Sequence, residues 1–362
     1  MKIVKSIIFH ILVGASAALA ALMVFVSYSD HFHPLDHPVL ACLGMVMPFF
    51  LVANLISLFV LLMVRWRWAF IPIVAFLVCI PAIRVYLPLH FPSEAPPGSI
   101  KIISFNVGGY AFNKPNPNPL DTIVKYLIRQ NADIVCLQED KSTKYNTTEP
   151  FDTLYPYNDT VHVNSPTNPL INAVGIHSRY PIVKKERISY ESRTNGSVAF
   201  FLLIDGDTVI VVNNHLESTH MNDTDRQHYT DIINGDMNSD EARAETRHLI
   251  DKLGVAMIKR APQAEAVHQY IEQHRSYPII VCGDFNDTPI SYSRRTVAQG
   301  LTDCFVETGN GPGISYNVRG FYFRIDYMMC SEHFEPYSCH VDTDIDASDH
   351  YPVVGWLQRV KM

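Results

Sequence analysis

A carboxylate and a carboxamide stand two residues apart directly after a run that predicts a buried strand. Residues 279–282 are apolar and mostly β-branched, and Gly283 lets the backbone turn where they end. Asp284 and Asn286 then project to the same side of an extended segment, where they could hold a water molecule and an anionic oxygen. The same spacing also suits an Asx-turn that caps the chain's own amides before Pro289.

Other polar side chains stand where further predicted strands end. Asn106 precedes two glycines and Glu139 follows an apolar run, so each fits an ordinary turn as well as a site. The remaining candidates are His215, Asp326 and the adjacent Asp349 and His350. His215 follows a predicted strand and could instead be a hydrogen-bonded core histidine. Asp326 lies inside a strand pattern, where burying a carboxylate is costly unless it is paired.

The elements that must position these residues are strands with fewer strong helices between them. Two packed sheets with helices outside, a four-layered α/β sandwich, are the expected fold. Residues 219–239 are polar and without period, which predicts an exposed loop, and Gly254 and Pro262 predict breaks in a helix over 240–274. The predicted strands lie at 100–106, 133–137, 173–177, 198–204, 208–213, 279–283, 324–329 and 353–357, and the other helices at 120–130 and 291–300.

Before this body, residues 1–90 are overwhelmingly apolar and predict a membrane anchor with three transmembrane helices. The spans are expected at 7–28, 39–64 and 69–87, followed by a Pro-rich linker at 91–98 and a catalytic domain at 99–362. Lys2 and Lys5 lie before the first span and two arginines lie in the turn 65–68, which predicts a cytoplasmic N-terminus. Arg84, near the end of the third span, weighs slightly against this orientation but could snorkel to the outer interface. Three crossings then place the domain outside the cytoplasm.

Net charge and the spacing of the cysteines limit which partners and metals the sequence favours. After residue 97 the chain has 24 basic and 33 acidic residues, a net charge of −9 by count. Such a domain has no general attraction for a phosphate backbone, so nucleic acid is possible as a partner but not favoured. The cysteines show no repeated CxxC spacing, so neither a disulfide framework nor a zinc site is indicated. The expected partners are the lipid bilayer and a phosphoester substrate, and the sequence indicates no protein partner.

Six ordered motifs within about residues 100–360 resemble those of the endonuclease/exonuclease/phosphatase superfamily. This superfamily includes deoxyribonucleases, apurinic-site endonucleases, neutral sphingomyelinases and inositol-polyphosphate phosphatases, and its fold is a four-layered α/β sandwich. The motifs are Ser104-Phe105-Asn106-Val107, Leu137-Gln138-Glu139, Asn214-His215-Leu216, Gly283-Asp284-Phe285-Asn286, Arg324-Ile325-Asp326-Tyr327 and Ser348-Asp349-His350. Apurinic-site endonucleases carry an Asp where this chain has Gly108, so repair of apurinic DNA is not expected.

The resemblance implies attack of water on a phosphoester with Mg²⁺, or Mn²⁺ as an alternative. Glu139 is implied as the metal carboxylate, with Asn106 at the metal or the phosphate and Asp349 supporting the metal side. These are the hard oxygen ligands that Mg²⁺ prefers. The resemblance therefore implies a metal-dependent phosphoric ester hydrolase.

The resemblance also implies how the remaining residues share the chemistry. Asp284 would orient or deprotonate the attacking water, and Asn286 would hold that water or a phosphate oxygen. His350 would lie on the phosphate with its second nitrogen fixed by Asp326, and His215 would donate to the developing charge. Whether Asp284 or His350 is the base stays open.

Three functions remain open on the sequence. The favoured one is a membrane-anchored, extracytoplasmic phosphodiesterase or phosphatase that acts on a lipid-borne or small phosphoester. The alternative is a nuclease for extracellular DNA or RNA, which would need a local basic patch; the candidates are Arg193, Arg294, Arg295, Arg319 and Arg324. A non-catalytic binding protein on the same fold is the third.

Overall fold

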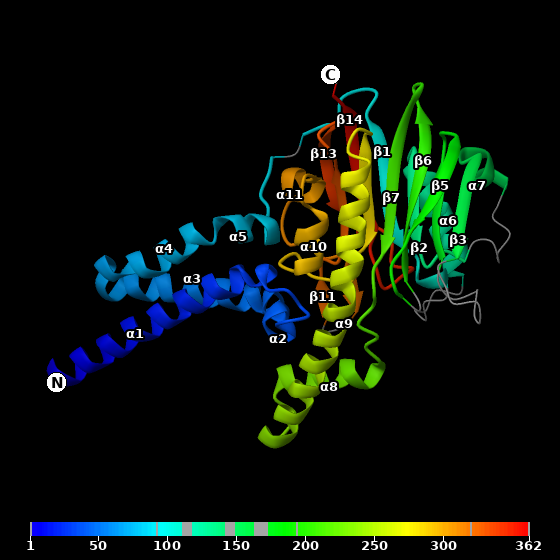
Figure 1. Cartoon of the computed structure of the whole chain (residues 1–362). Helices are drawn as coiled ribbons and strands as arrows, with labels where there is room; N and C mark the ends of the chain where they lie inside the picture. The colour runs from blue at the N-terminus through cyan, green and yellow to red at the C-terminus, as the bar shows by residue number, and fades with distance from the viewer. Residues whose placement is uncertain are drawn as a thin grey trace.

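The computed structural model describes residues 2–91, 93–110, 118–141, 149–162, 173–192, 195–318 and 321–360. A group of N-terminal helices extends from one side of a body that contains two β-sheets (Figure 1). The body carries every candidate site residue, and the helices join it through a short extended segment.

Each of the two large sheets has six strands. The first has the order β13-β14-β1-β2-β4-β3 and the second has the order β5-β6-β7-β8-β12-β9. The first consists of β13 (Phe334–Val341), β14 (Val353–Arg359), β1 (Ile100–Asn106), β2 (Ile134–Gln138), β4 (Ala173–Ser178) and β3 (Tyr157–His162). The second consists of β5 (Ile182–Ile188), β6 (Gly196–Ile204), β7 (Asp207–His215), β8 (Ile279–Asp284), β12 (Asp326–Cys330) and β9 (Thr302–Asp303). A separate hairpin pairs β10 (Tyr316–Val318) with β11 (Phe321–Phe323).

The sheets pack face to face and helices cover their outer faces. The central core takes apolar side chains from both sheets, among them Ile102, Val211 and Met328. On the outer face of the first sheet lie α6 (Pro119–Gln130) and α7 (Glu149–Leu154), and on that of the second lie α9 (Ser239–Gln273) and α10 (Tyr292–Val297). A further short helix of this body, α11 (Cys304–Thr308), packs on β13. The predicted four-layered α/β sandwich is confirmed.

Strand direction brings the polar strand ends to one edge. β1 and β2 are parallel, as are β7 and β8, so their carboxyl ends lie together. β12 runs antiparallel to β8 with Asp326 opposite Asp284, so this strand begins where β8 ends. Beneath this edge the buried Gln138 side chain donates to Asn213 Oδ1 at 2.6 Å, which ties the two sheets together. Residues from both sheets therefore face one place.

The N-terminal part differs from the prediction of three spans. By length and apolar composition, two helical segments of the described chain could cross a membrane, Ile3–His31 and Pro38–Val78. The predicted third span at 69–87 is interrupted at Cys79, because Pro81 has no N–H to continue the helix. The helices are α1 (Lys2–Ser27), α2 (Pro38–Ala41), α3 (Met47–Arg65), α4 (Phe70–Val78) and α5 (Ile80–Tyr86), with 3₁₀ turns η1 (Ser29–His31), η2 (Cys42–Val46) and η3 (Trp66–Ala69).

The N-terminal part packs closely on the body through α2 and η2. A Cβ atom added to Gly44 would lie 1.8 Å from the carbonyl oxygen of Ile290, so only glycine permits this approach. Gly254 of α9 leaves room for Pro38 in a similar way, since a Cβ atom added to Gly254 would lie 3.2 Å from the Cβ of Pro38. Arg84 adds an ion pair to Glu307 at 2.7 Å.

Two predictions about residues 219–274 were wrong. The predicted loop contains α8 (Asp223–Asn234), which begins with a capping box between Asn222 and Asp225. The helix α9 continues through Gly254 and Pro262 without the predicted breaks. Burial of its inner face on the second sheet offsets the proline's cost of about 3 kcal/mol.

Candidate active site

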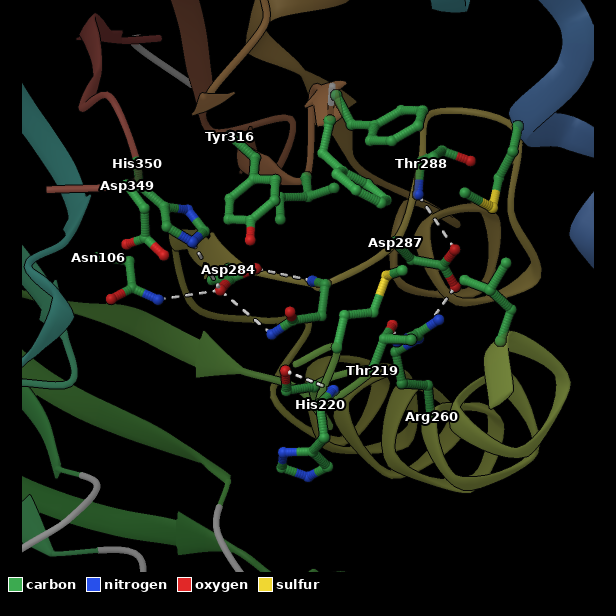
Figure 2. A pocket seen from close by; sticks show the side chains of 18 of the residues that line it. Asn106, Thr219, His220, Arg260, Asp284, Asp287, Thr288, Tyr316, Asp349 and His350 are labelled. Carbon is green, nitrogen blue, oxygen red and sulfur yellow. Dashed lines mark hydrogen bonds and ion pairs between the residues drawn. The ribbon is translucent and has the colours of Figure 1, made fainter. Parts of the chain in front are cut away.

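One carboxylate oxygen of Asp284 lies at the centre of the polar edge (Figure 2). Its Oδ2 accepts hydrogen bonds from Asn106 Nδ2 at 3.0 Å and Asn286 Nδ2 at 3.1 Å. The Nε2 atoms of His215 and His350 lie 3.7 and 3.8 Å from the same oxygen. Burial raises the pKa of Asp284 to about 6, although His350 opposes the shift. This carboxylate is therefore mostly ionised at neutral pH yet basic enough to accept a proton.

The backbone before and after Asp284 is held in conformations that few residues tolerate. Gly283 has φ 128°, and a Cβ there would lie 2.0 Å from the carbonyl oxygen of Asn214. Asn286 has φ 53°, and its N–H donates to Asp284 Oδ1 at 2.7 Å. The Asx-turn considered for the sequence is thus present, and it also orients the Asp284 carboxylate.

His350 is held by a second carboxylate. Its Nδ1 lies 2.8 Å from Asp326 Oδ2, and both side chains are almost fully buried. Burial lowers the pKa of His350, but Asp326 and Asp284 raise it more, to about 10. His350 is therefore an imidazolium that presents Nε2 to the Asp284 side of the site. The other oxygen of Asp326, Oδ1, has no hydrogen-bond partner among the described residues.

A group of oxygen donors lies beside Asp284 and suits a hard divalent cation. Glu139 follows β2 with φ 54°, and its Oε1 lies 3.4 Å from Asn106 Nδ2. Burial and the nearby Asp349 carboxylate raise the pKa of Glu139, which shows that its negative charge is poorly compensated. A cation between these carboxylates would supply that compensation. The carboxylates of Glu139 and Asp349 thus fit the predicted metal, whereas Asn106 turns its Nδ2 toward Glu139 and its Oδ1 accepts from the N–H of Gly108 at 3.1 Å.

Asp284, Asp326 and His350 form a second compact group, with ligand atoms within 4.8 Å of one another. This group is a possible Asp/Asp/His metal site. Its Asp326 and His350 already share a hydrogen bond, however, whereas the Glu139 side chain is 31% exposed and accessible to an incoming ion. The Glu139 side stays the predicted position of the metal.

His215 differs electrostatically from His350. Burial lowers its pKa, and its Nε2 lies 3.9 Å from Glu139 Oε1 as well as near Asp284. Its Nδ1 has no hydrogen-bond partner within the described part of the chain. His215 is therefore a neutral donor between the proposed metal side and Asp284.

A cavity of about 260 Å³ lies over this polar cluster. It is lined by all of the predicted site residues except Asp326, which lies behind His350. The roles assigned to these residues stay predictions. The structure does bring them together, including Glu139 and His350, which are 211 positions apart in the chain.

Among the lining residues that were not predicted as site residues, Arg226 and Tyr316 contact each other. Arg226 of α8 donates to the hydroxyl of Tyr316 at 3.0 Å, and the Tyr316 ring makes an edge contact with His350. Arg226 is one of the two cationic residues other than histidine that line this cavity among the residues described, and its partner Asp223 is fully exposed. The capping box at Asn222 was the sequence signal that could have revealed the helix carrying it.

Solved structures with the same fold include enzymes from several organisms. The human nocturnin catalytic domain with bound sulfate anion matches 72% of this chain and 95% of its own, with 16% identity and a TM-score of 0.51. D. rerio TDP2 complexed with single strand DNA product matches 72% and 99%, with 14% identity and a TM-score of 0.51. An endonuclease/exonuclease/phosphatase from Beutenbergia cavernae matches 72% of both chains, with 16% identity and a TM-score of 0.50. At these identities the likenesses show the fold alone.

Sequence families assign the two parts of the chain separately. No curated protein matches the sequence significantly. Residues 9–86 match a domain of unknown function, and residues 103–350 match the Endonuclease/Exonuclease/phosphatase family. The second match covers more than half of the chain and includes each predicted site residue. The chain therefore belongs to the endonuclease/exonuclease/phosphatase family and is a phosphoric ester hydrolase of this metal-dependent group.

Proposed function

We propose that this protein is a membrane-anchored, Mg²⁺-dependent hydrolase of lipid-borne or small phosphoesters. The observation that carries the proposal is the arrangement at Asp284 Oδ2, where two amide donors and two histidines from both sheets surround one ionised carboxylate. Hydrolysis of a phosphoester needs a positioned nucleophile and donors for the charge that develops on phosphorus. The cluster offers both within one cavity.

In the proposed reaction, Asp284 orients a water molecule and accepts its proton as the oxygen attacks phosphorus. His350, kept protonated by Asp326, donates from Nε2 to a nonbridging phosphate oxygen. Asn106 and His215 add donors on the other side of Asp284. The phosphorus–oxygen ester bond then breaks, the leaving alkoxide takes a proton from water, and Asp284 returns the proton it accepted to solvent. His350 also faces the centre of the site, but it could act as the base only in its neutral form, which its raised pKa disfavours at neutral pH.

Glu139, Asn106 and Asp349 would hold the metal, with Mn²⁺ as an alternative to Mg²⁺. A divalent cation bound there supplies positive charge to the phosphate oxygens and to the leaving oxygen. The support is the uncompensated charge shared by Glu139 and Asp349 and the oxygen-rich donor set.

The N-terminal helices support the membrane assignment. Two segments of this part are long and apolar enough to cross a bilayer, and most of each is not buried in the protein. Lys2 and Lys5 at the start of α1 and the two arginines at the turn η3 favour a cytoplasmic N-terminus. An extracytoplasmic body requires three crossings, and we propose that α1, α3 and the α4–α5 segment after the turn η3 make them. The enzyme is then held next to a lipid surface.

Nucleic acid is the less favoured substrate. Of the five arginines considered for a basic patch, Arg193 and Arg319 lie outside the described residues. Arg294 forms an ion pair with Asp303 at 2.6 Å, and the buried Arg324 donates to the carbonyl oxygen of Val85. Arg295 lies near Asp30. These three cations are engaged within the protein, and none lines the cavity.

Assays of the full chain in lipid nanodiscs test the proposal. The substrates are choline and ethanolamine phospholipids, phosphoinositides, a water-soluble phosphodiester and supercoiled plasmid, each with Mg²⁺, Mn²⁺ or EDTA. We expect EDTA-sensitive hydrolysis of a lipid or small phosphoester by the wild-type chain and none by Asp284→Asn. Cleavage of plasmid alone would assign a nuclease, and no hydrolysis of any substrate would overturn the proposal.

A further inference from the structure

We propose that the cavity over Asp284 has an apolar branch that binds the hydrocarbon chain of the substrate. The expected substrate class is an amphiphilic phosphoester whose chain begins close to the phosphate. This inference rests on the proposed function, because it takes the phosphate to lie at the polar end of the same cavity. It adds a binding site for the part of the molecule that does not react.

The cavity is divided in chemical character. Its polar end contains the residues around Asp284, and the rest of its lining combines apolar side chains with polar ones, among them Thr219, Arg260 and Asp287. The apolar walls come from four separate regions of the chain: Met45 before α3, Met221 and Tyr229 at α8, Leu249, Leu253 and Met257 on α9, and Phe321, Phe323 and Ile325 after β10. A hydrocarbon ligand removes such apolar surface from water, so it is the ligand that these walls bind best.

The position of the apolar walls points to the membrane part. Met45 belongs to η2, two residues before α3 begins. In Figure 2 the faint blue ribbon of the N-terminal segment lies on the side of Thr288 and Asp287, opposite Asn106 and His350. The cavity therefore extends from the reactive residues toward the helices that are apolar enough to enter a bilayer. A chain that extends from the phosphate in this direction would pass along apolar surface.

Charge in this region is already neutralised. Arg260 is almost fully buried and pairs with Asp287 at 3.3 Å, and its Nη1 donates to the carbonyl oxygen of Glu217 at 3.0 Å. Arg260 thus offers no free charge to a second phosphate. A neutral chain fits this part of the cavity better than a nucleotide or a second anionic group.

The side chains themselves favour a flexible hydrocarbon over a flat base. Tyr229 and Phe321 contact each other with ring centroids 4.3 Å apart, so each covers a face of the other. Three of the lining residues are methionines, which adapt to chains of irregular shape. The cavity volume of about 260 Å³ is slightly below the range of about 300–1,000 Å³ that is typical of small-molecule sites. It therefore suits a phosphate with the first part of one chain.

Binding of alkylphosphonates to the full chain in nanodiscs tests the inference without turnover, because their carbon–phosphorus bond is not an ester. Methyl-, butyl-, hexyl- and octylphosphonate are titrated by calorimetry with Mg²⁺ present, and empty nanodiscs give the background. We expect Kd to fall roughly threefold to fourfold for each added methylene until the branch is full. A Kd that does not depend on chain length would overturn the inference.

Three variants locate the effect. Leu253→Trp fills the branch from a half-buried position, so the fall in Kd should stop at a shorter chain. Met257→Ala enlarges it, so the fall should continue to a longer chain. Val255→Trp, on the exposed face of the same helix, is the matched control and should behave as the wild type. Identical chain-length profiles for Leu253→Trp, Met257→Ala and Val255→Trp would overturn the inference.

The two proposals fail in different ways. Hydrolysis of phosphoesters without chain-length dependence of phosphonate binding would overturn the apolar branch and leave the hydrolase in place. Chain-length-dependent binding without hydrolysis of any phosphoester would support the branch and overturn the proposed reaction.

Discussion

The Nδ1 atom of His350 lies 2.8 Å from Oδ2 of Asp326, and the two side chains come from segments on different sheets. Asp326 begins β12, whereas His350 lies just before β14. This contact fixes the orientation of the imidazole and keeps it protonated. We therefore expect Asp326 to be a positioning residue that acts through His350.

Replacing this partner should reduce turnover more than binding. For Asp326→Asn we expect kcat to fall by about 10²-fold or more with little change in KM, because His350 loses both its orientation and its charge. Steady-state kinetics on the substrate identified in the nanodisc assay measures this split. Asp207→Asn, at an exposed position of β7, is the control and should retain wild-type kinetics. A change confined to KM would contradict the positioning role.

Glu139 should set the affinity for the metal. Glu139→Gln keeps the shape of the side chain but removes its charge, so the Mg²⁺ concentration for half-maximal activity should rise by at least about tenfold. Calorimetric titration of the metal into each protein gives a second readout that needs no substrate. Glu332→Gln, exposed in the turn after β12, is the matched control. Equal metal affinities in the two variants would refute the assignment.

The contact between Gly44 and Ile290 should be sensitive to a single methyl group. Gly44→Ala places a Cβ within 1.8 Å of the Ile290 carbonyl oxygen, and we expect destabilisation of about 1–3 kcal/mol, seen as a lower midpoint of thermal unfolding. Gly14→Ala is the control, since no described atom lies within 4 Å of its added Cβ. That substitution in α1 should be neutral or stabilising by up to about 1 kcal/mol. Equal midpoints for both variants would show that the contact is not formed.

Glu217 should make stability depend on acidic pH. Contacts with His220, with Lys259 at 3.0 Å and with Ser192 at 2.8 Å lower the pKa of Glu217 to about 2. The unfolded pKa is about 4.3, so the stabilisation is complete above this pH and is lost as pH falls toward 2.

Thermal unfolding of wild type and Glu217→Gln across this pH range measures the effect. The difference in stability should be about 1–2 kcal/mol at neutral pH and should shrink as the pH falls below about 4. Glu241→Gln, at an exposed position near the start of α9, should show no such convergence. A difference that is constant with pH would assign the effect to something other than this carboxylate.

The strand ends could be predicted because two local signals in the sequence, an apolar run and the polar residue after it, identify each of them. Apolar runs such as 279–282 identify buried strands, and a polar residue after each run identifies the edge where parallel strands stop. The Asp205-Gly206 pair between two strands is likewise a local signal, typical of a hairpin turn, and the structure pairs Ile204 with Asp207 across it. That Glu139 and His350 would share a cavity came from the family resemblance, since no local pattern links residues so far apart.

The helices around the cavity were harder to predict because tertiary contacts override local signals. Most residues of α8 remain at least partly exposed, so the helix shows no apolar period, and its capping box is its main local signal. In α9, Gly254 is a point of close contact with Pro38 and not a break. Arg226 could therefore be identified only through the capping box of its helix, and no local pattern marks the apolar side chains of α9 as cavity walls.

The wall that Met45 contributes has a practical consequence for anyone preparing this enzyme. Expression of the hydrophilic portion alone, from residue 99 onward, would delete that wall and uncover the backbone at Ile290. Substrate preferences measured on such a fragment would describe an altered pocket. Solubilising the intact polypeptide is therefore part of defining what it cleaves.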